Sequence, residues 1–315
     1  MTKTAFLFPG ESSHSVGMMS SMAGSYALVR DTFNEASEIL GYDLWSLTKH
    51  GPDTELNRAE IKKPAILVAG VATWRVWQQL GGAWPDFFAG HGLGEYSALV
   101  ATGVMQFTDA VSIVAQRGRF MQQATPPEGG AMACVWGLED TVVREICSQV
   151  ENGEIVSCAN YNAPGQVVIS GNRGAVGQAG DLALQAGARK VQLLPVDIPS
   201  HCRLMKPAAG KLQEALLMVH FDDASIPVIQ NADVRAYHDA EQIREALARQ
   251  LWQPVRWTET ILTQVESGVG RFFECGPGGL LADFNHKITP GSAVFSLTGQ
   301  DVMNEALQAE NNDGK

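Results

Sequence analysis

The chain has 315 residues, of which 45% are hydrophobic and 18% charged, and its formal net charge is -11. This length suits one large domain, or a large domain with a small insert. The acidic balance argues against nucleic acid or an anionic membrane as a bulk partner. The spacing of the five cysteines does not suggest disulfide pairs, and no C-x-x-C motif occurs. This pattern is typical of reduced, buried thiols in a cytoplasmic protein.

The first part of the chain predicts a buried strand followed by helices. Residues 5–8 form the expected strand, so no room is left before it for a signal peptide. A polar loop over residues 11–15 follows, then an amphipathic helix over 31–40. The apolar density of residues 64–80 predicts a long, largely buried helix. No apolar run approaches the roughly 18 residues that a membrane span needs.

The stretch from Pro85 to Leu99 predicts a short buried strand, a tight glycine turn and a helix that opens at Gly94. Glycines at positions 90, 92 and 94 allow left-handed backbone angles and the close approach of another group. A strand-turn-helix of this kind is the frame of a nucleophile elbow, in which G-x-S-x-G raises a serine above a parallel sheet. Here the central residue is Gly92, so the frame is present and the nucleophile is absent.

The middle of the chain predicts an inserted small domain. A helix capped by Asp109 runs to about residue 121, and the prolines and glycines of residues 126–130 end it. Strands and helices then follow in the order βαββαβ, which is that of a ferredoxin-like unit. They are expected at residues 131–136, 140–150, 155–160, 166–170, 174–186 and 190–196. We therefore expect a small domain over 128–197, which would roof the cleft beside the elbow.

The rest of the chain returns to the large domain, which comprises residues 1–127 and 198–315. Helices are expected at 205–218, 240–251 and 255–267, with strands at 228–231 and 271–275 and a further helix after 279. The acidic tail over 304–315 is expected to fray. The predicted fold class is α/β: an α/β-hydrolase-like large domain with a parallel sheet, plus the ferredoxin-like insert.

The motif G-H-x-L-G-E-Y-S-A-L at residues 90–99 closely resembles the active-site signature of malonyl-CoA:acyl-carrier-protein transacylases of bacterial fatty-acid synthesis. The resemblance covers essentially the whole chain, because further motifs follow in the family's order. They are F-P-G at 8–10, Q-R-G at 116–118, N-A-P-G-Q at 162–166, P-S-H-C at 199–202 and E-x-G-P-G at 274–278.

The resemblance implies a site and its partners. His201 matches the base that takes the proton of the nucleophile, and the backbone carbonyl of Gln250 would orient it. Arg117 matches the residue that pairs the malonyl carboxylate. The N–H groups of Leu93 and Glu11 match the oxyanion donors. Weaker candidates for pocket contacts are Asn160 and Gln166.

The implied partners are a coenzyme A thioester and an acyl carrier protein, with no cofactor and no metal, and a monomer fits the family. An acidic carrier would need a local basic patch on this acidic chain. The candidates for that patch are Lys62, Lys63, Arg117, Arg119 and Arg203.

The departures from the family pattern gather at one place. The loop after the first strand normally reads Gln-Gly-Ser-Gln in the family; this chain keeps only Ser13 and has Glu11, Ser12 and His14 around it. Lys63 likewise stands where the family usually has glutamine. Without a hydroxyl at Gly92, covalent malonyl transfer by the family route should be lost. A carboxylate at Glu11 should also oppose a developing oxyanion and the malonyl carboxylate.

Three hypotheses account for these changes. The chain is a transacylase-family protein without that activity that still binds CoA esters or a carrier, or it is a transacylase deliberately disabled. Alternatively, the site is remodelled, naturally or by engineering, into a serine hydrolase of activated esters. Its nucleophile would then be Ser12 or Ser13, with His14 or His201 as base and Glu11 as the acid or as a base itself.

Overall fold

The computed structural model describes residues 2–126, 128–150 and 153–312, and within them the larger sheet has five strands, all parallel, in the order β7-β2-β1-β8-β9. The central strand β1 pairs with β2 on one side and β8 on the other, with Phe8 opposite Gly90 and Leu7 opposite Glu274. The strands are β1 Lys3–Phe8, β2 Phe87–Gly90, β7 Val228–Ile229, β8 Val269–Glu274 and β9 Ala293–Ser296.

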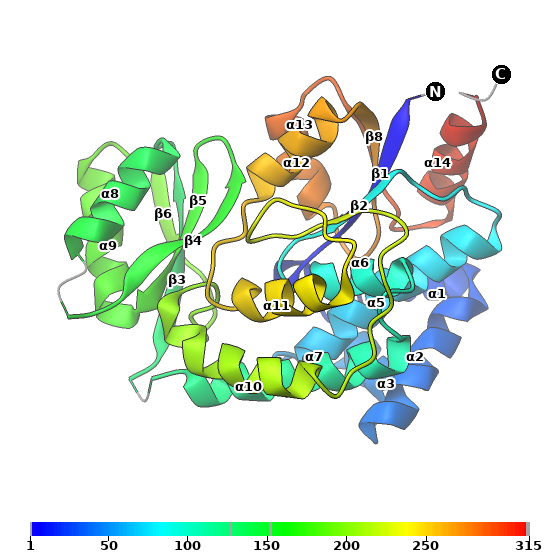
Figure 1. Ribbon diagram of the computed structural model, residues 1–315, viewed down its shortest axis with the longest axis horizontal. Helices are drawn as coiled ribbons and strands as arrows, with labels where there is room; N and C mark the ends of the chain where they lie inside the picture. The colour runs from blue at the N-terminus through cyan, green and yellow to red at the C-terminus, as the bar shows by residue number, and fades with distance from the viewer. Residues whose placement is uncertain (1, 127, 151–152, 313–315) are drawn as a thin grey trace.

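The large sheet is covered on both faces, as Figure 1 shows. Successive side chains of a strand point to opposite faces, so β1 serves two cores. Phe6 and Phe8 pack in a cluster with the helices α5 to α7, while Ala5 and Leu7 pack with α12 and α13. These helices are α5 Ala59–Gln79, α6 Gly94–Ala101, α7 Phe107–Ala124, α12 Trp257–Glu266 and α13 Leu280–Ile288. The three-layer arrangement leaves the carboxyl ends of β1 and β2 side by side.

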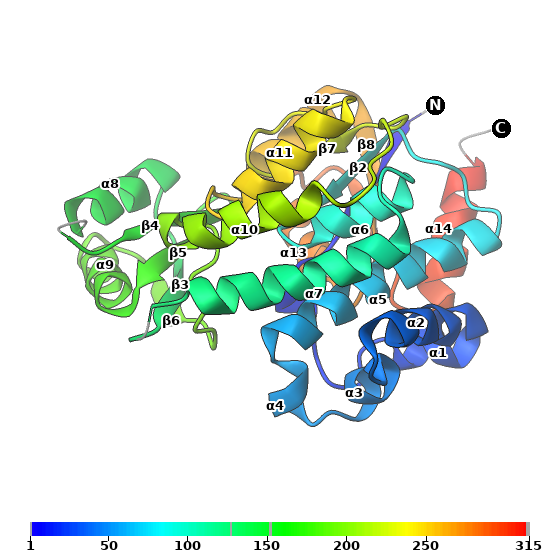
Figure 2. The ribbon, with the colours of Figure 1, turned by 60° about the horizontal axis from the view of Figure 1, so that its bottom comes forward.

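The remaining helices of the large domain surround this core. Figure 2 shows α10 lying along α7, with α1 to α4 packed at the opposite side of α7 and α5. Their bounds are α1 Ser20–Ser25, α2 Ala27–Leu40, α3 Leu44–His50, α4 Asp53–Leu56, α10 Lys206–Leu216, α11 Ala240–Gln250 and α14 Gln300–Asn312. Short 3-10 turns occur at Glu11–Ser13 and Arg203–Met205.

The predicted βαββαβ unit is present as a second, antiparallel sheet with the strand order β4-β5-β3-β6. Helices α8 and α9 contribute to a separate hydrophobic cluster with the strands of this sheet. Its elements are β3 Gly130–Trp136, α8 Asp140–Val150, β4 Val156–Ala163, β5 Gln166–Asn172, α9 Arg173–Gln185 and β6 Lys190–Leu193. The predicted fold class is confirmed; the domain bounds at 127/128 and 197/198 stay a prediction.

Two local predictions were wrong. Helix α7 begins at Phe107 with Gln106 as its N-cap, so Asp109 lies inside the first turn and is not the cap. The tail expected to fray is helical over Gln300–Asn312, because Met303 and Ala306 are buried against the core; residues 313–315 lie outside the described residues. Among the helices described, none is long and apolar enough to cross a bilayer.

Candidate active site

The three glycines of the elbow differ in backbone conformation and in packing. Gly92 alone of the three has a left-handed backbone, with φ 55°. A Cβ at Gly90 would lie 2.0 Å from the carbonyl carbon of Gly94, and one at Gly94 would lie 2.0 Å from the Phe8 oxygen. Gly90 and Gly94 are therefore required by close backbone packing, whereas Gly92, which is also buried, lies at the apex of the turn.

The apex of the elbow faces His201. A Cβ built at Gly92 would lie 3.3 Å from His201 Nε2, and apart from residues 91 and 93 the one other described atom within 4 Å is His201 Cε1 at 3.8 Å. His201 Nδ1 donates to the Gln250 carbonyl at 2.8 Å, so the proton is on Nδ1 and Nε2 presents its lone pair to position 92. The His201 backbone has φ 61°, a conformation that non-glycine residues rarely adopt outside functional sites.

The electrostatic environment keeps His201 uncharged. Burial, assisted by the positive charge of Arg117, lowers the pKa of His201 to about 4. The imidazole is therefore neutral near pH 7 and available as a proton acceptor. The predicted base and its orienting carbonyl are thus brought together at the elbow.

The Gln250 side chain connects Arg117 to the elbow. Its Oε1 accepts from Arg117 at 3.2 Å, and its Nε2 donates to the Gly92 carbonyl at 2.8 Å. Arg117 itself is 1% exposed, so these contacts replace the water that its guanidinium has lost. The arrangement fixes the guanidinium relative to the elbow backbone.

Glu11 lies against three cations. Its Oε1 is 2.6 Å from Lys63 Nζ and 3.4 Å from an Arg117 nitrogen, and its Oε2 is 3.9 Å from Lys62 Nζ. Burial alone would raise the pKa of Glu11, but the cations, Lys63 first, hold it well below its usual range. Burial lowers the pKa of Lys63 to about 8.

This cluster revises the expected effect of Glu11. Because Lys62, Lys63 and Arg117 surround the carboxylate, its negative charge is offset and the repulsion expected from an isolated carboxylate is largely removed. The remaining effect of Glu11 is that its carboxylate occupies a binding position on Arg117, because one guanidinium nitrogen already donates to it.

The rest of the changed loop does not assemble a second triad. Ser12 is exposed, and the buried Ser13 Oγ has no hydrogen-bond partner among the described residues. His14 Nδ1 bonds the Glu11 carbonyl at 2.7 Å, and its Nε2 lies 2.7 Å from Asn57 Oδ1. Both ring nitrogens of His14 are therefore engaged away from either serine.

The two oxyanion candidates end up at the same edge of the sheet. Phe8 and Gly90 are register partners in the parallel pair of β1 and β2. Glu11 lies three residues after Phe8, and Leu93 lies three residues after Gly90. Within the residues described, neither amide N–H donates to an internal acceptor. Both amides thus lie just after the paired ends of β1 and β2, without an internal acceptor among the described residues.

Two weaker candidates are not part of this cluster. Gln166 accepts from Lys287 of α13, a helix of the large domain, at 3.0 Å. Asn160 is buried in β4, where its backbone bridges to Val255 at the seam with the large domain. The proposed basic patch also fails in part, because Lys62, Lys63 and Arg117 are buried around Glu11.

Sequence reasoning missed a clamp beneath the elbow. Asn231 Oδ1 accepts from the Gly92 N–H at 2.8 Å, and its Nδ2 donates to the Gly90 carbonyl at 2.6 Å. The Asn231 N–H donates to Glu95 Oε2 at 2.8 Å. Burial raises the pKa of Glu95 to about 7. No spacing signal marks Asn231, which lies 139 residues after Gly92.

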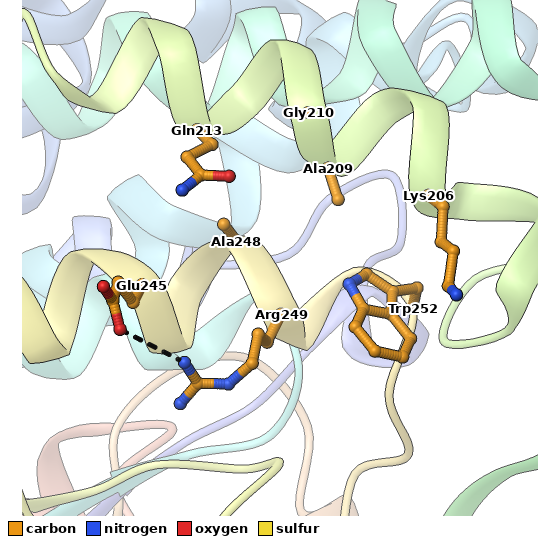
Figure 3. Close-up of a pocket in the computed structure, with 8 residues that line it drawn as sticks. All are labelled: Lys206, Ala209, Gly210, Gln213, Glu245, Ala248, Arg249 and Trp252. Atoms are coloured by element: carbon orange, nitrogen blue, oxygen red, sulfur yellow. Dashed lines mark ion pairs between the residues drawn. The ribbon is translucent and has the colours of Figure 1, made fainter.

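A separate surface groove of about 340 Å³ lies between α10 and α11 (Figure 3). Its charges are already matched: Arg249 pairs with Glu245 at 3.6 Å and with Asp233 at 2.5 Å, and Lys206 lies over the Trp252 ring. The groove contains none of the residues gathered at the elbow.

Comparison with known proteins gives consistent findings. Residues 5–290 match a family described as the acyl transferase domain. The malonyl CoA-acyl carrier protein transacylase of Salmonella typhimurium is 47% identical over 307 residues, covering 98% of this chain and 99% of that protein. The protein of the same description from Bacillus subtilis (strain 168) is 39% identical, with 99% of each chain covered.

Solved structures are equally similar. An acyl carrier protein S-malonyltransferase from Vibrio cholerae superposes with a TM-score of 0.94 at 46% identity, covering 97% of this chain and 100% of that one. A malonyl-transacylase solved in complex with its type II PKS acyl-carrier protein gives a TM-score of 0.96 at 45% identity, covering 98% of this chain and 100% of that chain.

Proposed function

The chain belongs to the malonyl-CoA:acyl-carrier-protein transacylase family, and on that premise we propose that it is a transacylase scaffold that has lost covalent malonyl transfer. One observation carries the proposal. The Cβ position of residue 92 lies 3.3 Å from a neutral, oriented His201, which is where a nucleophilic hydroxyl would meet its base, and residue 92 is glycine.

In this proposal no neighbouring group takes the place of the missing hydroxyl. Acyl transfer through an enzyme-bound ester needs a nucleophile within hydrogen-bond reach of the base. When a triad loses its nucleophile, the rate falls by several orders of magnitude, and only transition-state binding is left. His201, the Gln250 carbonyl and the amides of Leu93 and Glu11 supply that remaining binding in our proposal.

We propose that the chain still binds acyl-CoA and an acyl carrier protein. The relatives are named for both partners, and a related malonyl-transacylase forms a complex with its carrier. A monomer suits this function, because the exposed large apolar side chains lie on several separate elements of the described chain.

Glu11 changes which acyl groups this site would accept. A malonyl carboxylate bound to Arg117 would have to displace Glu11, which is 3.4 Å from the guanidinium and is held by Lys63. We therefore propose that acyl groups without a carboxylate compete better here than they do in a site with glutamine at position 11.

Intact-protein mass spectrometry after incubation with malonyl-CoA or acetyl-CoA tests these proposals. We expect no adduct on the chain itself and an acyl adduct on Gly92→Ser. On the Gly92→Ser single variant, the acetyl adduct should form in about the same yield as the malonyl adduct. Adding Glu11→Gln and Lys63→Gln should shift loading towards malonyl. A malonyl adduct on the unchanged chain would overturn the loss of transfer.

The relocated-serine hydrolase is the second candidate, and no contact among the described residues favours it over the first. A fluorophosphonate probe separates the two. Labelling of Ser12 or Ser13, removed by Ser→Ala at the labelled position, would support the hydrolase. An unlabelled chain beside a labelled Gly92→Ser variant would leave the disabled transacylase as the explanation.

A further inference from the structure

We propose that this site hydrolyses acyl thioesters directly, with a water molecule acting where a serine hydroxyl would otherwise act. The inference rests on the proposed function, because it uses the same acyl-thioester site. It adds a reaction that needs no covalent enzyme intermediate. Its substrates would be thioesters of coenzyme A or of a carrier-bound thiol.

The geometry provides room for a water beside the base. Apart from two atoms of His201, no described atom outside the adjacent residues lies within 4 Å of a Cβ at Gly92. Replacing the CH₂OH of serine by hydrogen frees a volume of about 30 Å³, which is the share of one water in the liquid. A water there can donate to His201 Nε2, whose lone pair faces position 92 because Nδ1 is bonded to Gln250.

The elbow does not depend on a side chain at residue 92 for its shape. The Gly92 N–H donates to Asn231 Oδ1 at 2.8 Å, and its carbonyl accepts from Gln250 Nε2 at 2.8 Å. The N–H and the carbonyl of the glycine are therefore each fixed by a hydrogen bond to a different side chain. The flexible residue stays in the elbow conformation, and the space beside His201 persists.

The reaction balances with water as the only added reactant. The water gives one proton to His201 Nε2 while its oxygen bonds to the thioester carbon, and the oxyanion accepts from the N–H groups of Leu93 and Glu11. Collapse of this intermediate breaks the C–S bond, and the imidazolium returns the proton to the leaving thiolate. The products are a carboxylic acid and a free thiol.

The expected rate is low but measurable. Triads without their nucleophile retain an acceleration of about 10³–10⁴-fold over the uncatalysed reaction, from the oxyanion site and binding. The low basicity of His201 also limits its strength as a proton acceptor. A slow, single-step hydrolysis is thus the expected behaviour.

The test compares the chain with Gly92→Ala, which fills the space beside His201 and adds no nucleophile. Thiol release from acetyl-CoA and malonyl-CoA is followed with a thiol reagent, and intact mass is recorded in the same samples. We expect release by the chain without any acyl adduct. Both Gly92→Ala and His201→Gln should lower the rate at least tenfold.

Control measurements keep the outcomes distinct. CoA binding and thermal unfolding of each variant show whether it is folded, and His201→Gln serves if Gly92→Ala is not. Equal hydrolysis by the chain and a folded variant, or no hydrolysis above buffer, would overturn the inference and leave the proposed function intact. An acyl adduct on the chain would instead overturn the proposed function.

Discussion

Glu11 and Lys63 are best understood as a pair. Lys63 is 1% exposed in its side chain and lies 2.6 Å from Glu11, whose side chain is 26% exposed. Other cations, Lys62 and Arg117, lie close to the same carboxylate. A buried amine among like charges needs its carboxylate, so either partner alone would be harmful where both together are tolerated.

A double-mutant cycle measures this dependence. Glu11→Gln should destabilise the chain by about 2–4 kcal/mol, below the full range for buried pairs because Glu11 is partly exposed. Lys63→Gln should lose less, about 1 kcal/mol, because Arg117 still faces Glu11. The double variant should return to within about 1 kcal/mol of the original, since neither charge remains. Urea unfolding at pH 7 gives all four free energies, and strict additivity would contradict the coupling.

At the scale of elements, Glu95 on α6 couples the elbow to pH. Its carboxylate accepts from the Asn231 N–H beneath the turn, and burial raises its pKa from 4.5 to about 7. Between these two pH values the folded state binds more protons at this group than the unfolded state does. The contribution of Glu95 to stability is therefore fully present below pH 4.5 and is lost as the pH rises through 7.

Glu95→Gln isolates that effect. Glutamine keeps an oxygen for the Asn231 N–H and cannot carry the desolvated charge. Relative to the original chain, the variant should gain little at pH 4.5 and up to about 3 kcal/mol at pH 8. Free energies of unfolding from urea titrations at both pH values provide the check, because other titrating groups such as His201 cancel in the difference. An equal difference at both pH values would rule out titration of Glu95.

Helices, strands and turns that are marked by nearby residues could be predicted from the sequence, whereas contacts between distant segments could not. The glycine turn, the βαββαβ order and most helices follow from periodicity and punctuation that lie within a few residues. The hydrogen bond between Asn231 and Gly92 and the contact between His14 and Asn57 depend on packing between distant segments. The opposite charges of Glu11 and Lys63, both at positions where the resemblance leads us to expect glutamine, were a signal that could have indicated their contact.

At the scale of the whole molecule, the small sheet is bonded to the large domain through its own backbone. The Tyr161 N–H donates to the Val255 carbonyl at 2.9 Å, and the Val255 N–H donates to the Ala159 carbonyl at 2.8 Å. Nearby, His91 beside the elbow lies 2.8 Å from the Asn162 side-chain oxygen. Strand β4 thus extends its pairing across the seam to the segment before α12, next to the active site.

These bonds predict that the small domain does not swing as an independent lid. Opening the seam would expose the buried backbone groups of Val255 and Ala159, so the amides of Tyr161 and Val255 should exchange only when much of the molecule unfolds. Native-state hydrogen exchange in low urea measures their opening free energies, with the amides of β1 as the internal reference. Values within about 1 kcal/mol of β1 are expected. Opening of the seam at a free energy far below that of β1 would contradict this prediction and would show a hinge between the small sheet and the large domain.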